Sequence, residues 1–179
     1  MSIPPFLRDV RAIRERARQH IEEGAVTPGY DADRATAITL LNAALATELV
    51  CVLRYRRHYY MASGFRGATA AEEFLEHAGE EQAHADRIAQ RIVQLGGEPD
   101  LDPEGLLSRS HSEYVPGDSL DEMIREDLIA ERIAIETYGE MIRFFGESDP
   151  TTRRLLEEIL AKEEEHADDL AELLRVVGA

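Results

Sequence analysis

A pair of repeated motifs constrains this chain more than any other feature of its sequence. In the first half, Glu48 is followed 33 residues later by Glu81-Gln-Ala-His84. In the second half, Glu131 is followed 32 residues later by Glu163-Glu-Glu-His166. Residues three apart lie on one face of a helix, so each Glu-x-x-His motif can present two ligands to one metal ion. The repeat therefore predicts two similar helical halves whose acidic residues face each other.

Apolar periodicity and helix-capping signals indicate where these helices begin and end. The capping-box sequences Thr69-Ala-Ala-Glu72 and Ser119-Leu-Asp-Glu122 each open a helix, and Asp149-Pro150 opens another. Gly64 to Gly67 is expected to stop the helix before Thr69. We therefore expect four long helices, at about residues 33–62, 69–95, 119–145 and 150–176.

The segment between the second and third helices is rich in helix breakers. Residues 98–117 contain Pro99, Pro103, Gly105 and Pro116. About twenty extended residues reach roughly 65 Å, enough to cross a bundle lengthwise. The predicted fold is therefore an all-α four-helix bundle over residues 31–179, with one long crossover between helices 2 and 3. Residues 1–30 form an N-terminal extension with an extra helix, expected at about residues 6–23.

Charge and cysteine content narrow the classes of function. Thirty-six acidic residues outnumber twenty basic ones, giving a formal charge of −16, so we expect no general DNA binding. The extension is locally basic, and we favour a subunit contact for it over a DNA contact; its arginines are Arg8, Arg11, Arg14, Arg16 and Arg18. Cys51 is the single cysteine, which excludes cysteine-based zinc and iron–sulfur sites and suits a buried position.

The sequence shows no targeting signal and no obvious membrane segment. Its first residues lack the basic-then-apolar pattern of a signal peptide. No stretch approaches the roughly 20 apolar residues of a membrane span. We therefore expect a cytoplasmic protein with no membrane partner.

Electrostatics explains why the repeated motifs point to metal. Four carboxylates inside a bundle would repel one another, and burial would raise their pKa values. Two divalent cations balance these four charges. Four carboxylates and two imidazoles without thiolate suit iron or manganese better than a structural zinc site. One Glu-x-x-His is usually a solvated surface pattern, but two at matched spacing favour a metal site.

The chain resembles the bacterioferritin branch of the ferritin-like superfamily over about residues 40–175. Four segments carry the resemblance: Thr47-Glu-Leu-Val50, Glu81-Gln-Ala-His-Ala-Asp-Arg87, Ser119-Leu-Asp-Glu-Met-Ile124 and Glu158-Ile-Leu-Ala-Lys-Glu-Glu-Glu-His166. The resemblance implies a ferritin-like bundle that holds two iron ions, or two manganese ions, within each subunit.

The resemblance also assigns a role to each site residue. Glu81 and Glu163 would bridge the two metal ions. Each ion would be completed by one glutamate and one histidine, in the pairs Glu48 with His84 and Glu131 with His166. Tyr55 would hydrogen-bond a ligand carboxylate and donate an electron, and Tyr138 would act likewise at the pseudo-symmetric position.

Departures from the bacterioferritin pattern modify these expectations. Gln82 stands where bacterioferritins carry the Met that binds haem, so we expect no haem. Only 13 residues follow His166, too few for the short fifth helix of bacterioferritins. The N-terminal extension and the longer crossover resemble Dps-like mini-ferritins with a bacterioferritin-type site. That group often has a nearby Cys pair, which this chain lacks. We expect a homo-oligomer and favour a dodecamer over a 24-subunit cage.

The function implied by the resemblance is that of a ferroxidase. It would oxidise Fe²⁺ with H₂O₂ or O₂, for iron storage and protection against oxidative stress in an oligomeric cage. One alternative is a di-iron or di-manganese peroxidase or catalase that stores no iron. A second is a DNA- or partner-binding helical protein with vestigial ligands.

Several polar residues near the motifs receive a simpler interpretation. Glu80, Glu164 and Glu165 are expected off the ligand face. His77 lies one turn before Glu81 and is interpreted as an ordinary polar histidine, although it could contact the ligands. His58 is attributed to packing at the end of the first long helix.

Overall fold

The computed structural model describes residues 9–62 and 64–177, and these residues contain six α-helices and no strand. The four long helices are α2 (Arg34–Met61), α3 (Gly64–Gln94), α5 (Leu120–Phe145) and α6 (Pro150–Val177). The short ones are α1 (Val10–Arg16) and α4 (Leu106–Arg109), with a 3₁₀ turn at Ile21–Glu23.

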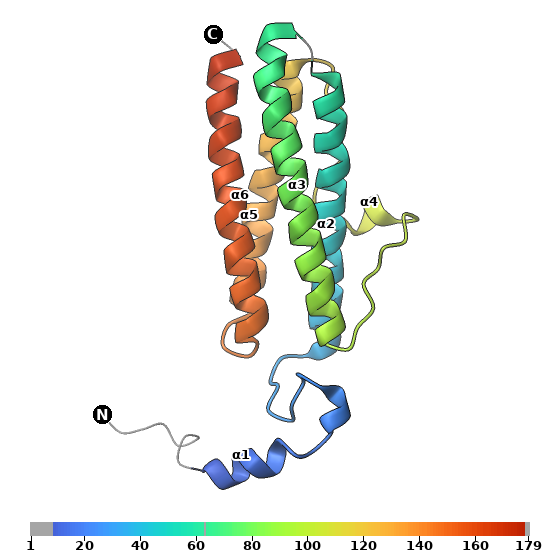
Figure 1. Cartoon of the computed structure of the whole chain (residues 1–179), viewed down its shortest axis with the longest axis vertical. Helices are drawn as coiled ribbons and strands as arrows, with labels where there is room; N and C mark the ends of the chain where they lie inside the picture. Colours follow the sequence, from blue (N-terminus) through green and yellow to red (C-terminus); the bar gives the residue numbers. More distant parts are fainter. Residues whose placement is uncertain (1–8, 63, 178–179) are drawn as a thin grey trace, which may run out of the picture.

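The four long helices form one bundle from two antiparallel pairs. Helix α2 packs chiefly against α3, and α5 packs chiefly against α6. Figure 1 shows the four helices side by side, with the crossover and α4 running along the outside and α1 beyond one end. The predicted all-α bundle with one long crossover and an extra N-terminal helix is therefore confirmed.

Two apolar layers fill the bundle, one toward each end. One layer contains Leu41, Leu45, Ile88, Ile92, Met141, Leu156 and Ile159, all at most 4% exposed. The other contains Cys51, Phe74, Ala78, Ile124 and Leu170. The motif residues 48, 81, 84, 131, 163 and 166 fall between these layers in each helix. The acidic cluster is thus enclosed from both ends of the bundle.

Helix α2 is more apolar than we predicted from the sequence. By length and composition alone it is apolar enough to cross a membrane, so the expectation of no such stretch was wrong. More than half of that stretch is buried inside the bundle. A central bundle helix buries much of its circumference, and this burial accounts for the apolar composition of α2.

The start of α3 differs from the prediction. The helix begins at Gly64, so Thr69 lies inside it and caps nothing. A Cβ added to Gly67 would come within 3.2 Å of the Ala62 carbonyl carbon, closer than ordinary contact. Glycine therefore allows the first turn of α3 to lie against the end of α2.

The predicted caps of α5 and α6 are confirmed. Ser119 Oγ accepts a hydrogen bond from the Glu122 amide at 3.2 Å, and Glu122 accepts one from the Asp118 amide. Asp149 accepts one from the Thr152 amide at 2.9 Å, immediately before α6. These side chains satisfy amides that the first helical turn leaves without partners.

The N-terminal helix is shorter than expected. Helix α1 ends at Arg16 rather than near residue 23, and His20 has a left-handed φ of 50°. No residue of α1 is buried, so only local interactions support it, such as the Asp9 cap and the Arg11–Glu15 pair, and isolated helices this short are marginal. Arg8 lies outside the described residues. The subunit contact expected for this segment stays a prediction.

Candidate metal centre

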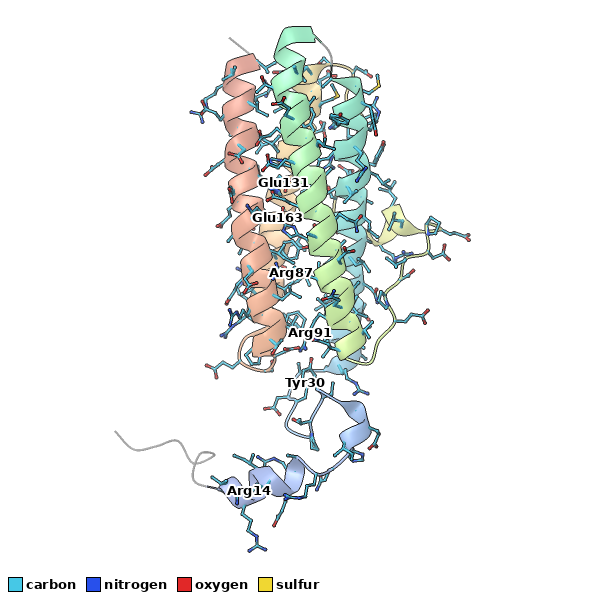
Figure 2. All side chains as sticks on the ribbon, viewed as in Figure 1. Arg14, Tyr30, Arg87, Arg91, Glu131 and Glu163 are labelled. Atoms are coloured by element: carbon cyan, nitrogen blue, oxygen red, sulfur yellow. The ribbon has the colours of Figure 1, made fainter. Side chains whose placement is uncertain are left out.

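All six motif residues meet at the centre of the bundle, each at most 5% exposed. Glu48 comes from α2, Glu81 and His84 from α3, Glu131 from α5, and Glu163 and His166 from α6. Figure 2 shows Glu131 and Glu163 near mid-height between the helices. Every long helix therefore contributes at least one side chain to a single buried cluster.

The first half of the cluster surrounds the Nδ1 atom of His84. This nitrogen lies 3.0 Å from Glu163 Oε1, and 3.5 Å from both Glu48 Oε2 and Glu81 Oε2. Ligands about 2.1 Å from a common metal ion lie roughly 3–4 Å apart. The spacing of these four groups therefore suits one metal ion.

The second half surrounds the Nδ1 atom of His166. This nitrogen lies 3.2 Å from Glu81 Oε1, 3.4 Å from Glu163 Oε2 and 4.0 Å from Glu131 Oε2. Glu81 and Glu163 belong to both halves, and each presents one carboxylate oxygen to each histidine. This is the arrangement that two adjacent metal ions bridged by two carboxylates require.

Glu80 fixes the orientation of the His166 ring. Its carboxylate lies 2.6 Å from His166 Nε2 and also pairs with Lys162 at 3.2 Å. Partial burial would raise the pKa of Glu80, but its bonds with His166 and Lys162 outweigh burial and lower it. An ionised Glu80 accepts the Nε2 proton and leaves Nδ1 for a metal. Glu80 is therefore a contact of the centre, which the sequence reading missed; Glu164 and Glu165 are exposed as expected.

Unpaired buried atoms show that the cluster fits a cation. Within the described residues, four of its atoms are buried without a hydrogen-bond partner: Glu48 Oε2, His84 Nδ1 and both Glu163 oxygens. Burial and the neighbouring Glu81 charge raise the pKa values of Glu48 and Glu131 well above the usual range. Buried acceptors that face one another are costly unless a cation lies between them.

The pKa values of the two histidines in the cluster are also raised, but here the neighbouring carboxylates, and not burial, are the cause. Burial would lower the pKa of His84, but the carboxylates of Glu163, Glu48 and Glu81, which lie close to its Nδ1 atom, outweigh burial and raise the pKa to about 12. Burial would also lower the pKa of His166, but its contacts with Glu163 and Glu81 outweigh burial and raise the pKa to about 10. Without metal, protons therefore offset part of the carboxylate charge.

Two tyrosines hydrogen-bond the two glutamates that belong to only one half of the cluster, Glu131 and Glu48. Tyr55 donates a hydrogen bond to Glu131 Oε1, and Tyr138 donates one to Glu48 Oε1. Burial is the main cause, and the charge of the adjacent glutamate the next, that raises the pKa values of both tyrosines well above the usual range. Both hydroxyls therefore keep their protons and act as donors. The two bonds follow the internal repeat, since each tyrosine reaches the lone glutamate of the other half.

His77 is more than an ordinary polar histidine. Its side chain is 2% exposed, and its ring stacks on His166 with centroids 4.0 Å apart. Its Nδ1 lies 3.3 Å from the Tyr55 hydroxyl. The i−4 spacing from Glu81 was the available signal, because it places His77 on the ligand face one turn away.

A second buried network was not expected from the sequence. The Arg54 guanidinium lies 2.7 Å from Asp127, whose other oxygen lies 2.7 Å from His58. Arg54 also donates to Ser112 and to the Glu113 carbonyl. The network attaches the end of the crossover to α2 and α5. An arginine within the apolar pattern of α2 was the one signal of it.

Comparison with known proteins places this geometry in a family. The model of the ferritin-like domain matches residues 38–177, which span all four long helices. The chain belongs to the ferritin-like family. Its sequence is 31% identical to the bacterioferritin of Desulfovibrio desulfuricans over 134 residues, covering 74% of this chain and 71% of that one. It is also 31% identical to the bacterioferritin of Mycobacterium leprae, covering 79% and 85%.

Solved structures of ferritin-like proteins agree with this assignment. A bacterioferritin-related protein of Bacteroides fragilis, described as a dodecameric thioferritin, superposes with a TM-score of 0.79 at 34% identity. That match covers 83% of this chain and 89% of the other. The D. desulfuricans bacterioferritin, described with a diiron site, gives 0.72 at 27% identity and covers 81% of each chain. The Dps of Thermosynechococcus elongatus, at 23% identity, shares the fold with a TM-score of 0.75.

Proposed function

We propose that this ferritin-like chain is a ferroxidase whose site binds two Fe²⁺ ions as substrate. The observation that carries the proposal is the sharing of Glu81 and Glu163 between two four-residue groups. Glu48 and His84 complete one group, and Glu131 and His166 complete the other. The diiron bacterioferritin among its structural relatives supports iron over manganese as the metal.

The proposed reaction takes one electron from each Fe²⁺ ion. With H₂O₂ as oxidant, two electrons and two protons convert one peroxide into two waters. With O₂, the same two electrons and two protons yield one H₂O₂. The apolar layers above and below the site exclude bulk water, and the bridging glutamates hold both ions beside one oxidant.

In this proposal Tyr55 and Tyr138 position two of the metal-binding glutamates. Tyr55 and Tyr138 hold Glu131 and Glu48 by hydrogen bonds, which fixes the outer carboxylates before metal binds. Tyr55 can in addition supply an electron to the reaction, and Tyr138 is its pseudo-symmetric counterpart. Gln82 is half-buried and hydrogen-bonds Asp86 on its own helix, and we propose a protein without haem.

We further propose a cytoplasmic homo-oligomeric cage in which residues 31–179 form the bundle and residues 1–30 an extension. The dodecameric relative at 34% identity supports a dodecamer over a 24-subunit shell. Iron storage and consumption of peroxide then occur together, because the same reaction uses both Fe²⁺ and H₂O₂. The strongly negative net charge of the chain does not favour DNA as a partner.

The test is aerobic and peroxide-driven Fe²⁺ oxidation by the purified chain, with mass measured by light scattering. Wild type is expected to oxidise two Fe²⁺ per subunit rapidly, and Glu81→Ala/Glu163→Ala is expected to lose at least a hundredfold in rate. Glu164→Ala/Glu165→Ala, adjacent and exposed, serves as the control. Equal rates for the wild type and the bridging-residue variant would sink the proposal.

Assembly and turnover distinguish the remaining functions. A dimer that consumes peroxide without accumulating iron would favour a peroxidase or catalase. Retention on DNA at physiological salt without any iron oxidation would favour a binding protein with vestigial ligands.

A further inference from the structure

Three residues outside the six-ligand cluster form another group with metal-ligand geometry. Glu73 and His77 lie on α3, and Asp169 lies on α6, one turn beyond His166. His77 Nε2 is 3.4 Å from Glu73 Oε1 and 3.9 Å from Asp169 Oδ2. One ligand atom from each residue lies within 4.8 Å of the other two. These separations suit a common cation about 2.1 Å from each atom.

The hydrogen bonds of His77 leave its Nε2 atom as the one that faces the carboxylates. Tyr55 donates its only hydroxyl proton to Glu131, so its oxygen accepts from His77 Nδ1. In a neutral imidazole whose Nδ1 carries the proton, Nε2 carries a lone pair. Stacking on His166 and 2% exposure hold the ring in this orientation. A buried acceptor therefore points at two further acceptors.

Neither Glu73 nor Asp169 pairs with a lysine or arginine among the described residues. Their side chains are 29% and 47% exposed, so the group opens to solvent. On the other side of the buried centre, Arg91 pairs with Asp149, the residue before α6, at 2.9 Å, and Arg87 pairs with Glu158. Figure 2 shows Arg87 and Arg91 on the side of Glu163 that faces the N-terminal segment. Beyond His166, both helices present acids to the same imidazole.

We infer that Glu73, His77 and Asp169 bind a third divalent cation at the solvent-facing edge of the buried centre. One imidazole and two carboxylates suit Fe²⁺, Mn²⁺, Co²⁺ or Zn²⁺. The binding site stands independently of any oxidation reaction. Its position against His166 also makes it a loading site for Fe²⁺, a role that rests on the proposed function.

Anaerobic equilibrium dialysis of the full-length protein against Co²⁺ tests the site directly. Wild type is expected to bind three Co²⁺ per subunit, and Asp169→Asn and Glu73→Gln two each. The matched controls Asp168→Asn and Glu72→Gln change exposed neighbours of the same chemistry and should retain three. A wild-type stoichiometry of two would mean that the three residues bind no cation, and three ions retained in both site variants would place the third ion elsewhere; either result would overturn the inference.

A variant of the buried centre separates this proposal from the previous one. Glu81→Gln/Glu163→Gln is expected to lose two Co²⁺ and keep one, and adding Asp169→Asn should remove the last. Anomalous diffraction from Co²⁺-soaked wild-type crystals should place that ion between the three side chains. If the buried pair does not bind metal, wild type binds one ion and Asp169→Asn none. An anomalous map without density at His77 Nε2 would contradict the third site alone.

Discussion

The hydroxyl of Tyr55 is the junction between the buried centre and the His77 group. It donates to Glu131 and accepts from His77, at a position with no solvent access. Removing it leaves a buried carboxylate oxygen and a buried imidazole N–H without their partner. Unsatisfied buried groups of this kind cost about 1–3 kcal/mol.

We therefore expect Tyr55→Phe to lower the free energy of unfolding of the metal-free protein by about 1–3 kcal/mol. Urea denaturation followed by circular dichroism measures this change. Tyr60→Phe, at a position 75% exposed, should differ from wild type by less than about 0.5 kcal/mol. Equal destabilisation by the two substitutions would mean that the Tyr55 hydrogen bonds contribute nothing to the folded state.

At the scale of helices and connections, Asp149 joins three parts of the chain. It caps α6, receives two hydrogen bonds from Arg91 on α3, and accepts one from Tyr30 in the N-terminal extension at 2.8 Å. Burial would raise the pKa of Asp149, but hydrogen bonds from Thr152, Tyr30 and Arg91 outweigh it and lower the pKa. Its folded pKa therefore lies below its unfolded value of about 4.

This lowered pKa predicts how stability depends on pH. The contribution of Asp149 is fully present above about pH 4 and is lost as pH falls through the folded pKa. Asp149→Asn should cost about 2–3 kcal/mol at pH 7, and the difference from wild type should shrink below pH 4. Urea denaturation across pH 3–7 measures it. Asp121→Asn, which breaks an exposed pair with Arg125, is the control; a difference that did not change with pH would contradict the assignment.

Substitutions in the buried network of Arg54, Asp127 and His58 should affect stability through an unpaired buried charge. Asp127→Ala leaves the Arg54 charge buried and unpaired, which should cost about 3–5 kcal/mol. Replacing both partners, as Arg54→Met/Asp127→Leu, should recover much of this loss because no buried charge remains. Thermal unfolding compares the variants. A double variant no more stable than Asp127→Ala would indicate that packing, rather than the unpaired charge, dominates.

The sequence predicted these elements unevenly, for physical reasons. Helix periodicity and the Ser119 and Asp149 caps are local signals, so the long helices were found nearly in full. The matched Glu-x-x-His spacing predicted which side chains would meet. By contrast, Arg54 and Asp127 are 73 residues apart, and no local spacing encodes such a pairing. The start of α3 was missed because the capping pattern at Thr69 does not exclude an earlier helix start, and α3 already begins at Gly64.

Across the whole molecule, metal binding should release protons. Glu48 and Glu131 have raised pKa values, and His84 and His166 hold protons without metal, so bound ions must displace them. Affinity should therefore fall as pH falls below neutrality. Anaerobic Co²⁺ titration in a weakly buffered pH indicator measures proton release. Glu81→Gln/Glu163→Gln should release few protons, and proton-free binding by wild type would contradict these shifts.

Metal should also stabilise the fold. A ligand that binds only the folded state adds about 2.7 kcal/mol at a hundred times its Kd. We expect a higher unfolding midpoint with Co²⁺ present, measured by scanning calorimetry, and a smaller shift in Glu81→Gln/Glu163→Gln, which keeps only the ion beside His77. Identical midpoints for wild type with and without Co²⁺ would show that the cluster does not bind the ion in the folded state.

The distribution of the six side chains over all four long helices has a mechanical consequence. The helices pack mainly in two hairpins, α2 with α3 and α5 with α6. Glu81 comes from the first hairpin and Glu163 from the second, and both belong to each of the two groups of candidate ligands. A bound metal pair would therefore cross-link the two hairpins at mid-height. Amide hydrogen exchange in the middle turns of α3 and α6 would then slow on loading, so the iron content of the subunit would set its rigidity.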